Sequence, residues 1–442
     1  MSFSFKTTYE LRQETPLIHF QHDQSGATLR ATEVKPKLDK FLLRRYKHDN
    51  PGTKTPKNWF LKDTDALDYK LRFECKQIER IVLDTQKDES GKSIPNPYDI
   101  YYGNMGLEKG KKVKGVKAQN ETTVACTIIC LKKELLDYIK KHIEEFFIVT
   151  NFGRMQRKGF GSFLIDKDGE GEEVPKPSPK EIAQALCKEY GSKYCYSLPG
   201  DSAPFKRIKA LYGIMKSGYN FGGTYHKSLL FEFMQKEGFP NEKRGVKVRG
   251  IAPKIYKPEN IDKVYTPFQS KEFVDEQDET FYYVRALLGL ADHLEFNGRG
   301  DYRIIIDGKP KEGYEPLHVT VDITPLDKNI ERLKSPIFFK IIGHSIYYVG
   351  EPLNRDILGK EFTFSSSWDD AAGKVDKTVD KTGQAPPTFR VPAFAAPETV
   401  IDGFLEYVFN QRKDAFKGVS DLKGREGVVK FTRFNAGGQE VR

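Results

Sequence analysis

The chain has 442 residues, enough for two or three domains that each bury their own core. Hydrophobic residues make up 38% of it and charged residues 30%, the composition of an ordinary water-soluble protein. No run reaches the ~18 apolar residues that a membrane span needs, and the first ten residues lack the apolar core of a signal peptide. The sequence therefore predicts a cytoplasmic protein without a membrane partner. Its formal charge of +10 allows a nucleic-acid partner but does not require one.

The cysteines argue against two kinds of stabilising site. There are five of them, an odd number, and no two form a CxxC pair: Cys75, Cys126, Cys130, Cys187 and Cys195. An odd number argues against a disulfide framework, and the absence of a CxxC pair argues against a structural zinc site. We therefore expect free thiols, no bound metal and no cofactor.

The first 166 residues have the pattern of one α/β unit. An extended opening segment is followed by a helix predicted near 37–47, with Pro36 in its first turn. Residues 67–75 alternate strictly between apolar and polar side chains, which indicates a half-buried strand. After a polar excursion at 85–122, the pattern predicts a strand at 124–131, a helix at 133–147 and a strand at 162–166. This order of elements is that of a ferredoxin-like domain.

A helical stretch is predicted next, over residues 167–250. Ser178-Pro179-Lys180-Glu181 has the form of a capping box with proline at the first helical position, and it opens a helix that reaches Tyr190. Further helices are expected at 205–216 and 227–237. This stretch is either a subdomain or an insertion.

The remaining residues, 251–442, return to strands. Candidate strands lie at 302–306, 317–323, 337–342 and 345–349, the last two joined by a two-residue turn at Gly343-His344. Residues 365–388 are predicted to be a mobile loop, and a helix at 399–411 precedes a strand at 428–434. The helix-then-strand ending predicts a second, degenerate ferredoxin-like copy. The predicted fold class is α+β: two ferredoxin-like (RRM-like) domains with antiparallel sheets and a helical insertion between them.

A glycine-rich loop is the first candidate binding segment. Between Asn151 and Phe163 it contains Gly153, Arg154, Arg157, Lys158, Gly159, Phe160 and Gly161. Glycines let a backbone approach a phosphate closely, and the cations supply the complementary charge. Phe160 or Phe163 can stack on a base. The alternative is a tight turn with a solvated basic rim.

A second candidate is the segment 26–37, predicted as a loop before the first helix. Backbone N–H groups at a helix N-terminus form a natural seat for a phosphate. Five cations lie in or near this segment: Arg30, Lys35, Lys37, Arg44 and Arg45. The alternative is a charged, solvated helix. Residues 98–117 also interleave tyrosines and lysines, as single-strand binders do, although a disordered surface loop has the same composition.

The sequence offers little for catalysis. His19, His22 and Asp23 are the only close group of this kind, and no motif of a metalloprotease, a serine hydrolase or a P-loop enzyme accompanies them. No catalytic residue and no metal ligand is predicted.

Two of these segments are similar to a known family. Thr15-Pro16-Leu17 precedes Leu29, Arg30, Val34, Lys35 and Leu38, and Arg154 to Ser162 has the form Arg-x-x-Arg-Lys-Gly-Phe-Gly-Ser. This combination resembles the RAMP superfamily of type III-B CRISPR (Cmr) effector complexes, most of all the head subunit, although Pro36 stands where glycine is usual. Arg332 to Ile337 resembles a further family segment more loosely.

The resemblance implies an RNA-binding subunit that holds CRISPR RNA near its 3′ end and helps to hold target RNA, beside other subunits of the complex. RNA-guided complexes of this kind grip backbone and shape and leave sequence reading to base pairing. Two alternatives stay open: a RAMP-family RNA endonuclease that processes CRISPR RNA or cleaves target RNA, and a scaffold protein whose basic loops are merely solvated.

Overall fold

The computed structural model describes most of the chain: residues 4–19, 28–82, 117–201, 203–221, 224–251, 256–257, 263–267, 280–291, 293–306, 309–330, 333–369, 379–380, 385–424 and 427–441. These residues form two compact units. Unit 1 comprises the described residues of Met1–Tyr212, Ile337–Glu351 and Phe416–Arg442. Unit 2 comprises those of Gly213–Pro336 and Pro352–Ala415. The chain therefore passes more than once between units, and the predicted boundaries at 166 and 250 stay predictions.

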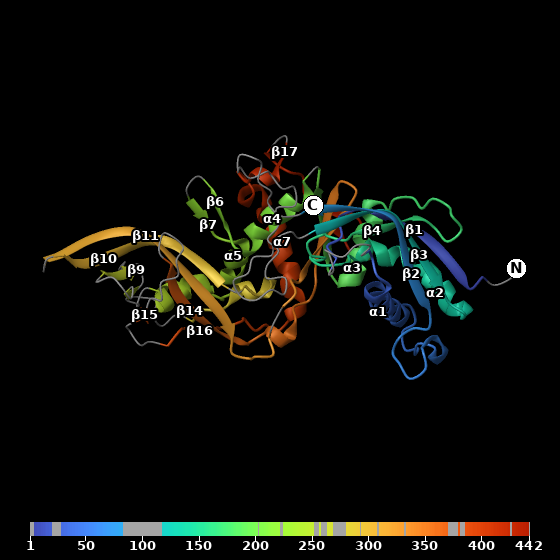
Figure 1. Ribbon diagram of the computed structural model, residues 1–442, viewed down its shortest axis with the longest axis horizontal. Helices are drawn as coiled ribbons and strands as arrows, with labels where there is room; N and C mark the ends of the chain where they lie inside the picture. Colours follow the sequence, from blue (N-terminus) through green and yellow to red (C-terminus); the bar gives the residue numbers. More distant parts are fainter. Residues whose placement is uncertain are drawn as a thin grey trace. The chain divides into compact units, whose positions relative to one another are not determined.

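The first sheet of unit 1 has the predicted ferredoxin-like topology (Figure 1). The elements follow in chain order as β1 (Lys6–Gln13), α1 (Ala31–Asp49), β2 (Lys70–Val82), β3 (Lys117–Ile129), α2 (Lys133–Val149) and β4 (Phe163–Lys167). The strand order is β2-β3-β1-β4, and every neighbouring pair is antiparallel. Between α1 and β2 lies one short 3₁₀ helix, η1 (Lys57–Trp59).

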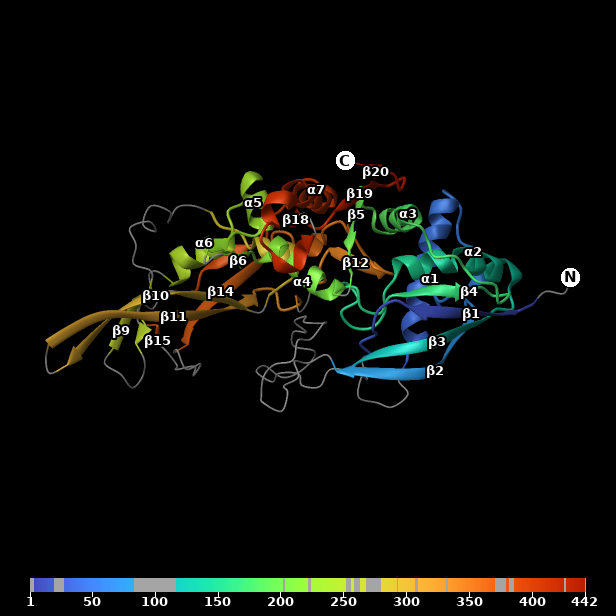
Figure 2. The same cartoon turned by 90° about the horizontal axis from the view of Figure 1, so that it is seen from above.

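The core of this sheet lies on the face that α2 covers, as Figure 2 shows. The apolar stripe of α2 recurs every three or four residues, so Leu136, Ile139 and Phe146 point the same way and are fully buried. They pack in one cluster with Ile128 and Phe163. Leu71 and Phe73 of the alternating strand are partly buried against it, which confirms the predicted half-buried strand.

A second sheet in unit 1 repeats the strand order of the first. It contains β5 (Tyr194–Pro199), β12 (Ile337–Ile342), β13 (Ser345–Gly350), β19 (Thr432–Asn435) and β20 (Glu440–Val441). The order is β12-β13-β5-β19-β20. In chain order β5, β12, β13 and β19 are the first to fourth strands of this sheet, so they lie side by side in the order second, third, first, fourth, as β2-β3-β1-β4 do in the first sheet. Helices α4 (Pro204–Lys216) and α7 (Pro397–Ala415) fall at the corresponding places in the chain order. The strand order of a second ferredoxin-like copy is therefore present, although α7 belongs to unit 2. Its first strand, β5, comes from the stretch for which the sequence predicts helices, so the predicted bounds of 251–442 stay a prediction.

The other predicted helices before residue 250 are present. Helix α3 (Pro179–Tyr190) begins with the predicted capping box at Ser178 and ends at Gly191. Helix α5 (Leu229–Lys236) is followed by α6 (Glu242–Gly245) and a π-helical turn at Val246–Ile251. A short hairpin pairs β6 (Tyr219–Phe221) with β7 (Thr224–His226).

Unit 2 is built around a sheet with the order β15-β8-β9-β10-β11-β14-β16. Its strands are β8 (Tyr256–Lys257), β9 (Lys263–Pro267), β10 (His293–Ile306), β11 (Lys309–Pro325), β14 (Glu361–Asp369), β15 (Val379–Asp380) and β16 (Thr388–Arg390). The long β10–β11 hairpin contains both strands predicted between 302 and 323. A small pair in unit 1, β17 (Lys423–Gly424) with β18 (Gly427–Val428), precedes β19. Among the described residues, no helix is long and apolar enough to cross a membrane.

Three expectations need correction or lie outside the described residues. Helix α1 begins at Ala31, so Lys35, Pro36 and Lys37 are helical and not part of a loop. Of the predicted mobile loop at 365–388, residues 365–369 belong to β14, 379–380 form β15 and Thr388 begins β16, because pairing with β11, β8 and β14 satisfies their backbone groups. Residues 370–378 and 381–384 lie outside the described part of the chain. The excursion at 85–122 is strand from Lys117 onward, and its residues up to 116 lie outside the described part of the chain.

Candidate nucleic-acid-binding pocket

A pocket of about 290 Å³ lies in unit 1 where α1, the glycine-rich loop, the end of α3 and the β12–β13 hairpin meet. It is lined by Lys37, Lys40, Phe41, Arg44, Thr150, Asn151, Gln156, Arg157, Glu189, Tyr190, Phe338 and Glu351. The lining contains four cations and two carboxylates. Three of these cations, Lys37, Arg44 and Arg157, come from the two segments that the sequence predicts to bind RNA, so the fold brings both segments to one cavity.

Lys37 joins α1 to the glycine-rich loop. Its Nζ donates to Glu33 Oε1 at 2.9 Å, to the Asn151 carbonyl at 3.0 Å and to Gln156 Oε1 at 2.8 Å. The ammonium also lies 4.9 Å from the centre of the Phe152 ring. Burial lowers the pKa of Lys37 from its usual value, and the pair with Glu33 opposes that shift. The residue therefore holds the loop in place as well as charging the pocket.

Arg157 projects from the glycine-rich loop toward aromatic side chains. Its guanidinium carbon is 5.8 Å from the Tyr190 ring centre and 5.7 Å from that of Phe338, and these two rings stack 4.6 Å apart. The Arg157 Nη2 forms an ion pair with Glu351. Its Nη1 is buried and has no hydrogen-bond partner among the described residues, although a guanidinium offers five donors in total. A buried donor without a partner is costly, so this group is suited to an incoming acceptor.

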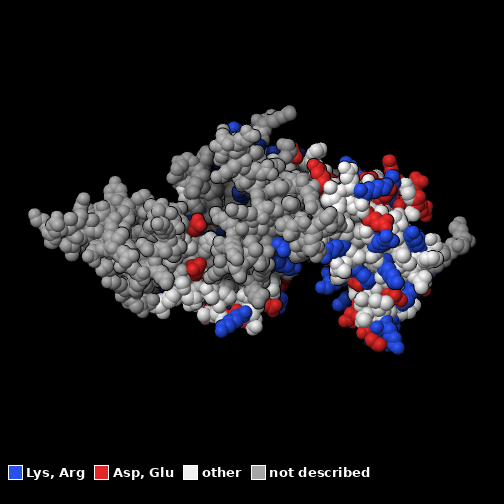
Figure 3. Space-filling view, in the orientation of Figure 1, with Lys and Arg blue, Asp and Glu red and all other residues white. Residues whose placement is uncertain are grey.

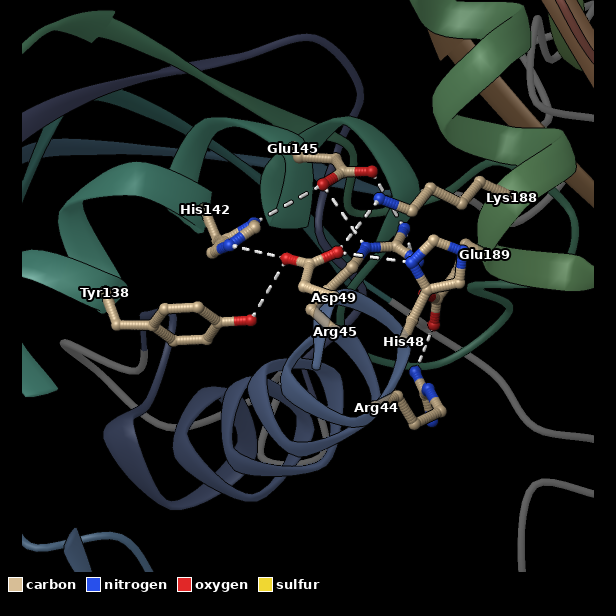
Figure 4. A network of polar contacts seen from close by, with 9 residues as sticks. All are labelled: Arg44, Arg45, His48, Asp49, Tyr138, His142, Glu145, Lys188 and Glu189. Carbon is tan, nitrogen blue, oxygen red and sulfur yellow. Dashed lines mark hydrogen bonds and ion pairs between the residues drawn. The ribbon is translucent and has the colours of Figure 1, made fainter. Parts of the chain in front are cut away.

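Arg44 and Arg45 are neighbours in the sequence with different environments (Figure 4). The Arg44 side chain is 57% exposed and pairs with Glu189. The Arg45 side chain is only 4% exposed, and it pairs with Glu145 at 2.9 Å and with Glu189 at 3.4 Å. Arg45 thus links α1 to α2 and α3 inside the fold, because burying a guanidinium requires carboxylate partners. Its contact with RNA stays a prediction, and its burial leaves little of the side chain exposed to a ligand.

The polar network around Arg45 continues to the end of α1. Figure 4 shows His142 of α2 between two carboxylates, with Nε2 3.5 Å from Asp49 Oδ2 and Nδ1 3.7 Å from Glu145 Oε2. Tyr138 donates to Asp49 at 3.4 Å. Burial raises the pKa of Glu189, which the ion pairs with Arg44 and Arg45 oppose. The network stabilises the helix layer behind the pocket.

The loop glycines are required by packing within the protein. Gly153, Gly159 and Gly161 have φ values of +75°, +89° and +68°. A Cβ on Gly153 would lie 2.6 Å from the Ile18 carbonyl oxygen, and one on Gly161 would lie 2.0 Å from that of Phe152. The N–H groups of Gly153, Arg154 and Gly161 already donate to Glu33, Ile18 and Pro16. These N–H groups are therefore occupied by the fold, and the loop contributes to the pocket through its side chains.

Other predicted contact residues have partners within the protein. Lys35 donates to Asp39 Oδ2 and to the Leu67 carbonyl, both at 2.8 Å. The Lys158 ammonium lies against the Tyr212 ring, and Arg30 Nε donates to His19 Nε2 at 2.6 Å. Arg154 forms an isolated β-bridge with Ile18. None of these four lines the pocket, and their contact with RNA stays a prediction.

The two phenylalanines proposed to stack on a base are core residues. Phe160 and Phe163 are both fully buried. Phe160 stacks on Phe205 of α4 with ring centres 4.1 Å apart, and Phe163 packs against Phe152. Their rings are not exposed to an incoming base, because the loop that carries them turns into the core.

Most of the pocket residues were not predicted to bind RNA from the sequence, among them Lys40 and four residues from beyond the glycine-rich loop. Lys40 lies one helical turn from both Lys37 and Arg44, so helical spacing was a sufficient signal for it. Glu189, Tyr190, Phe338 and Glu351 come from distant parts of the chain. Helix α3 carries Glu189 and Tyr190, and the β12–β13 hairpin positions Phe338 and Glu351, so no local pattern marks them.

The histidine candidates show no catalytic arrangement among the described residues. His19 is 1% exposed and accepts from Arg30, while His22 and Asp23 lie outside the described part of the chain. Within that described part, no group of three or more His, Cys, Asp or Glu side chains is placed to hold a metal ion. Figure 3 shows basic side chains interspersed with acidic ones over the face of unit 1.

Two ferredoxin-like strand orders in one chain, with a basic pocket beside a glycine-rich loop, define a RAMP-type protein. Residues 4–219 match the Cmr1 N-terminal domain and residues 225–421 match the Cmr1 C-terminal domain. Because the two matches together span most of the sequence, the chain belongs to the Cmr1 family of type III-B CRISPR systems.

Solved structures include distant likenesses. A chain of a type III-B Cmr-beta complex bound to cognate target RNA is 12% identical, with a TM-score of 0.39 over 91% of this chain and 99% of that one. Cmr1 from Pyrococcus furiosus in its apo form is 10% identical, with a TM-score of 0.36 over 88% of this chain and 99% of that one. No curated protein matches the sequence.

Proposed function

We propose that this chain is an RNA-binding subunit of a type III effector complex, which grips the backbone of CRISPR RNA near its 3′ end and helps to hold target RNA without cleaving either. The observation that carries the proposal is the meeting of α1 and the glycine-rich loop at one pocket, where Lys37, Lys40, Arg44 and Arg157 converge. Four cations against two carboxylates give the pocket net positive charge, which favours a phosphodiester. The buried Nη1 of Arg157 supplies a donor that such a ligand can satisfy.

Membership of the Cmr1 family supports a proposal about the binding partners of this chain. Cmr1 belongs to type III-B systems, and one structure similar in outline to this chain is that of a complex bound to cognate target RNA. We therefore propose CRISPR RNA, target RNA and the other subunits of the complex as partners. In such complexes base pairing reads the sequence and protein holds the backbone. A pocket with net positive charge is suited to holding a backbone phosphate.

The proposal is tested by replacing Arg157 with glutamine. Fluorescence titrations of two unrelated single-stranded RNAs at several salt concentrations should show weaker binding of both to the same degree, because phosphates carry no sequence information. The log–log salt slope should fall by about 0.7 for the one lost contact. Arg72→Gln is the charge-matched control, since this exposed side chain on β2 does not line the pocket. Unchanged affinity and slope in Arg157→Gln would exclude the pocket from the binding surface.

The endonuclease alternative has its own test. Wild-type protein is incubated with labelled repeat RNA and with a guide–target duplex, with and without Mg²⁺. We expect both RNAs to stay intact over hours. Cleavage that persists after repeated purification would show that the chain is a nuclease, whatever the affinity of its pocket.

A further inference from the structure

The two arginines that line the pocket are both held by acidic side chains. Arg157 of the glycine-rich loop pairs with Glu351, the residue after β13, and Arg44 of α1 pairs with Glu189 near the end of α3. The side chains of Arg157 and Glu351 are 18% and 17% exposed, so the first pair is largely withdrawn from water. All four residues line the same cavity.

We propose that Glu351 occupies the phosphate position of Arg157 in the free protein and must be displaced when RNA binds, an inference that rests on the proposed function of the pocket. Carboxylate and phosphate present similar pairs of acceptor oxygens to a guanidinium, and either can bind in the same fork geometry. The carboxylate is therefore a built-in competitor, and RNA binding is an exchange of one anion for another.

The charge of the cavity supports a competing role. Its four cations would carry a formal charge of +4, and Glu189 and Glu351 reduce this to +2. Glu351 lies at the end of a strand whose partner, β12, carries Phe338 in the cavity wall. Its position is thus set by the second ferredoxin-like sheet, while Arg157 comes from the first. The competing carboxylate reaches Arg157 only because the two sheets of unit 1 fold together.

The environment of Arg157 distinguishes a competitor from a simple stabilising pair. Nη2 pairs with Glu351, whereas Nη1 is buried and has no hydrogen-bond partner among the described residues. A pair built for stability alone gains most when both nitrogens of the fork are engaged. The aromatic rings of Tyr190 and Phe338 lie within 6 Å of the guanidinium, and they can hold its plane in place when the carboxylate leaves.

The experiment compares wild type, Glu351→Gln, Arg157→Gln and the double variant in titrations with single-stranded RNA. Glu351→Gln keeps the size of the side chain and removes its charge. We expect it to bind about fivefold more tightly with a steeper salt slope, since one more cation is then free to release counterions on binding. In the double variant this gain should disappear, because the competitor acts through Arg157. Glu74→Gln, at an exposed pair on β2, is the control for net charge.

Each outcome decides between the two proposals. Equal or weaker binding by Glu351→Gln, with wild type binding RNA, would overturn the competitor and leave the RNA-binding function standing. An equal gain with and without Arg157 would also overturn it, because the charge would then act only at long range. Absence of RNA binding by wild type and all variants would overturn the proposed function itself. If thermal unfolding shows that Glu351→Gln does not fold, Glu351→Asp takes its place: a shorter carboxylate holds Arg157 less well, so a smaller gain is expected and no gain overturns the inference.

Discussion

Lys340 lies on β12 with a side chain that is completely buried. Its Nζ donates at 2.8 Å to the carbonyl of Phe147 in α2 and at 2.8 Å to that of Thr150 just beyond it. Carbonyls at the C-terminal end of a helix lack partners within the helix, and a cation there interacts favourably with the negative end of the helix dipole. One side chain of the second sheet thus caps a helix of the first.

The same burial gives a prediction for pH. Desolvation lowers the pKa of Lys340 well below its usual 10.5, so the unfolded chain keeps this proton to a higher pH than the folded chain does. Stability therefore rises with pH in the window between the lowered pKa and 10.5, by up to about 1.4 kcal/mol per pH unit from this group. Lys340→Met should remove that increment. Urea unfolding of wild type and Lys340→Met across the alkaline range measures this increment. Parallel pH profiles of the two proteins would show that Lys340 does not contribute to the pH dependence of stability.

Two glycines with similar backbone angles separate conformational strain from steric conflict. Gly161 has φ +68°, and an added Cβ would lie 2.0 Å from the Phe152 carbonyl oxygen. Gly171 has φ +89° and nothing within 4 Å of that position. We expect Gly171→Ala to cost about 1 kcal/mol from the left-handed backbone alone, and Gly161→Ala to cost more than about 2 kcal/mol. Denaturant unfolding gives both values, and equal losses would show that the loop relaxes around the new methyl group.

At the level of elements, α3 has a beginning that the sequence specifies locally. Ser178 Oγ accepts from the Glu181 N–H at 3.3 Å, and the Ser178 N–H donates to Glu181 Oε2 at 2.7 Å. Pro179 occupies the first turn, where no backbone donor is needed. The capping box was predicted from four consecutive residues, because each of its contacts lies within one turn.

Removal of the cap should destabilise α3. Ser178→Ala is expected to lower the free energy of unfolding by about 1 kcal/mol. Ser178→Asp should retain most of this stabilisation, because an aspartate carboxylate can also cap the helix. The hydrogen bond from the Ser178 N–H lowers the pKa of Glu181 below 4.5. The contribution of that carboxylate is therefore present above pH 4.5 and is lost as the pH falls through the folded-state pKa. Thermal unfolding of the three proteins at neutral and acidic pH tests both statements.

Helix α1 shows where local patterns were insufficient. The sequence predicts its start near residue 37 because Pro36 is best tolerated in a first turn, but the helix begins at Ala31 with Pro36 inside. Lys37 and Arg45 fix the helix to the loop and to α2 and α3. Tertiary contacts of this kind outweigh the preference of one residue.

At the scale of the whole molecule, the first ferredoxin-like sheet depends on residues far along the chain. Its core cluster includes Ile182 and Leu186 of α3 together with Phe338, Val349 and Phe434 of the second sheet. A fragment of residues 1–166 would therefore leave apolar surface without its covering partners. We propose that residue 166 ends the first ferredoxin-like set of strands and helices, but that residues 1–166 do not form a stable domain without the rest of unit 1.

That proposal predicts the behaviour of the fragment. Residues 1–166 expressed alone should show much faster amide hydrogen exchange in α2 than the full chain does, since local protection follows buried contacts. The fragment is also expected to bind a hydrophobic dye. Equal protection of α2 in the fragment and in the full chain would show that the first copy folds independently.

The sequence by itself determined several elements and the order of the elements in the first ferredoxin-like copy. Apolar periods of 2 and 3.6 predicted β2 and α2, and the two-residue turn at Gly343-His344 predicted the β12–β13 hairpin, since each signal depends on residues only a few positions apart. It also indicated the basic segments that reach the pocket and the family that the chain belongs to. The structure corrects the start of α1 and part of residues 365–388. The predicted contacts of Arg45, Phe160 and Phe163 with RNA concern side chains that the fold buries.

Tertiary structure alone decided which cations meet and what surrounds them. Arg44 and Arg45 are adjacent, yet one is exposed beside the pocket and the other is buried between helices. Glu351 and Phe338 reach Arg157 only because β12 and β13 pair with β5 and fold against the first sheet. Burial and ion pairing depend on neighbours distant in the chain, and a local pattern carries no information about them.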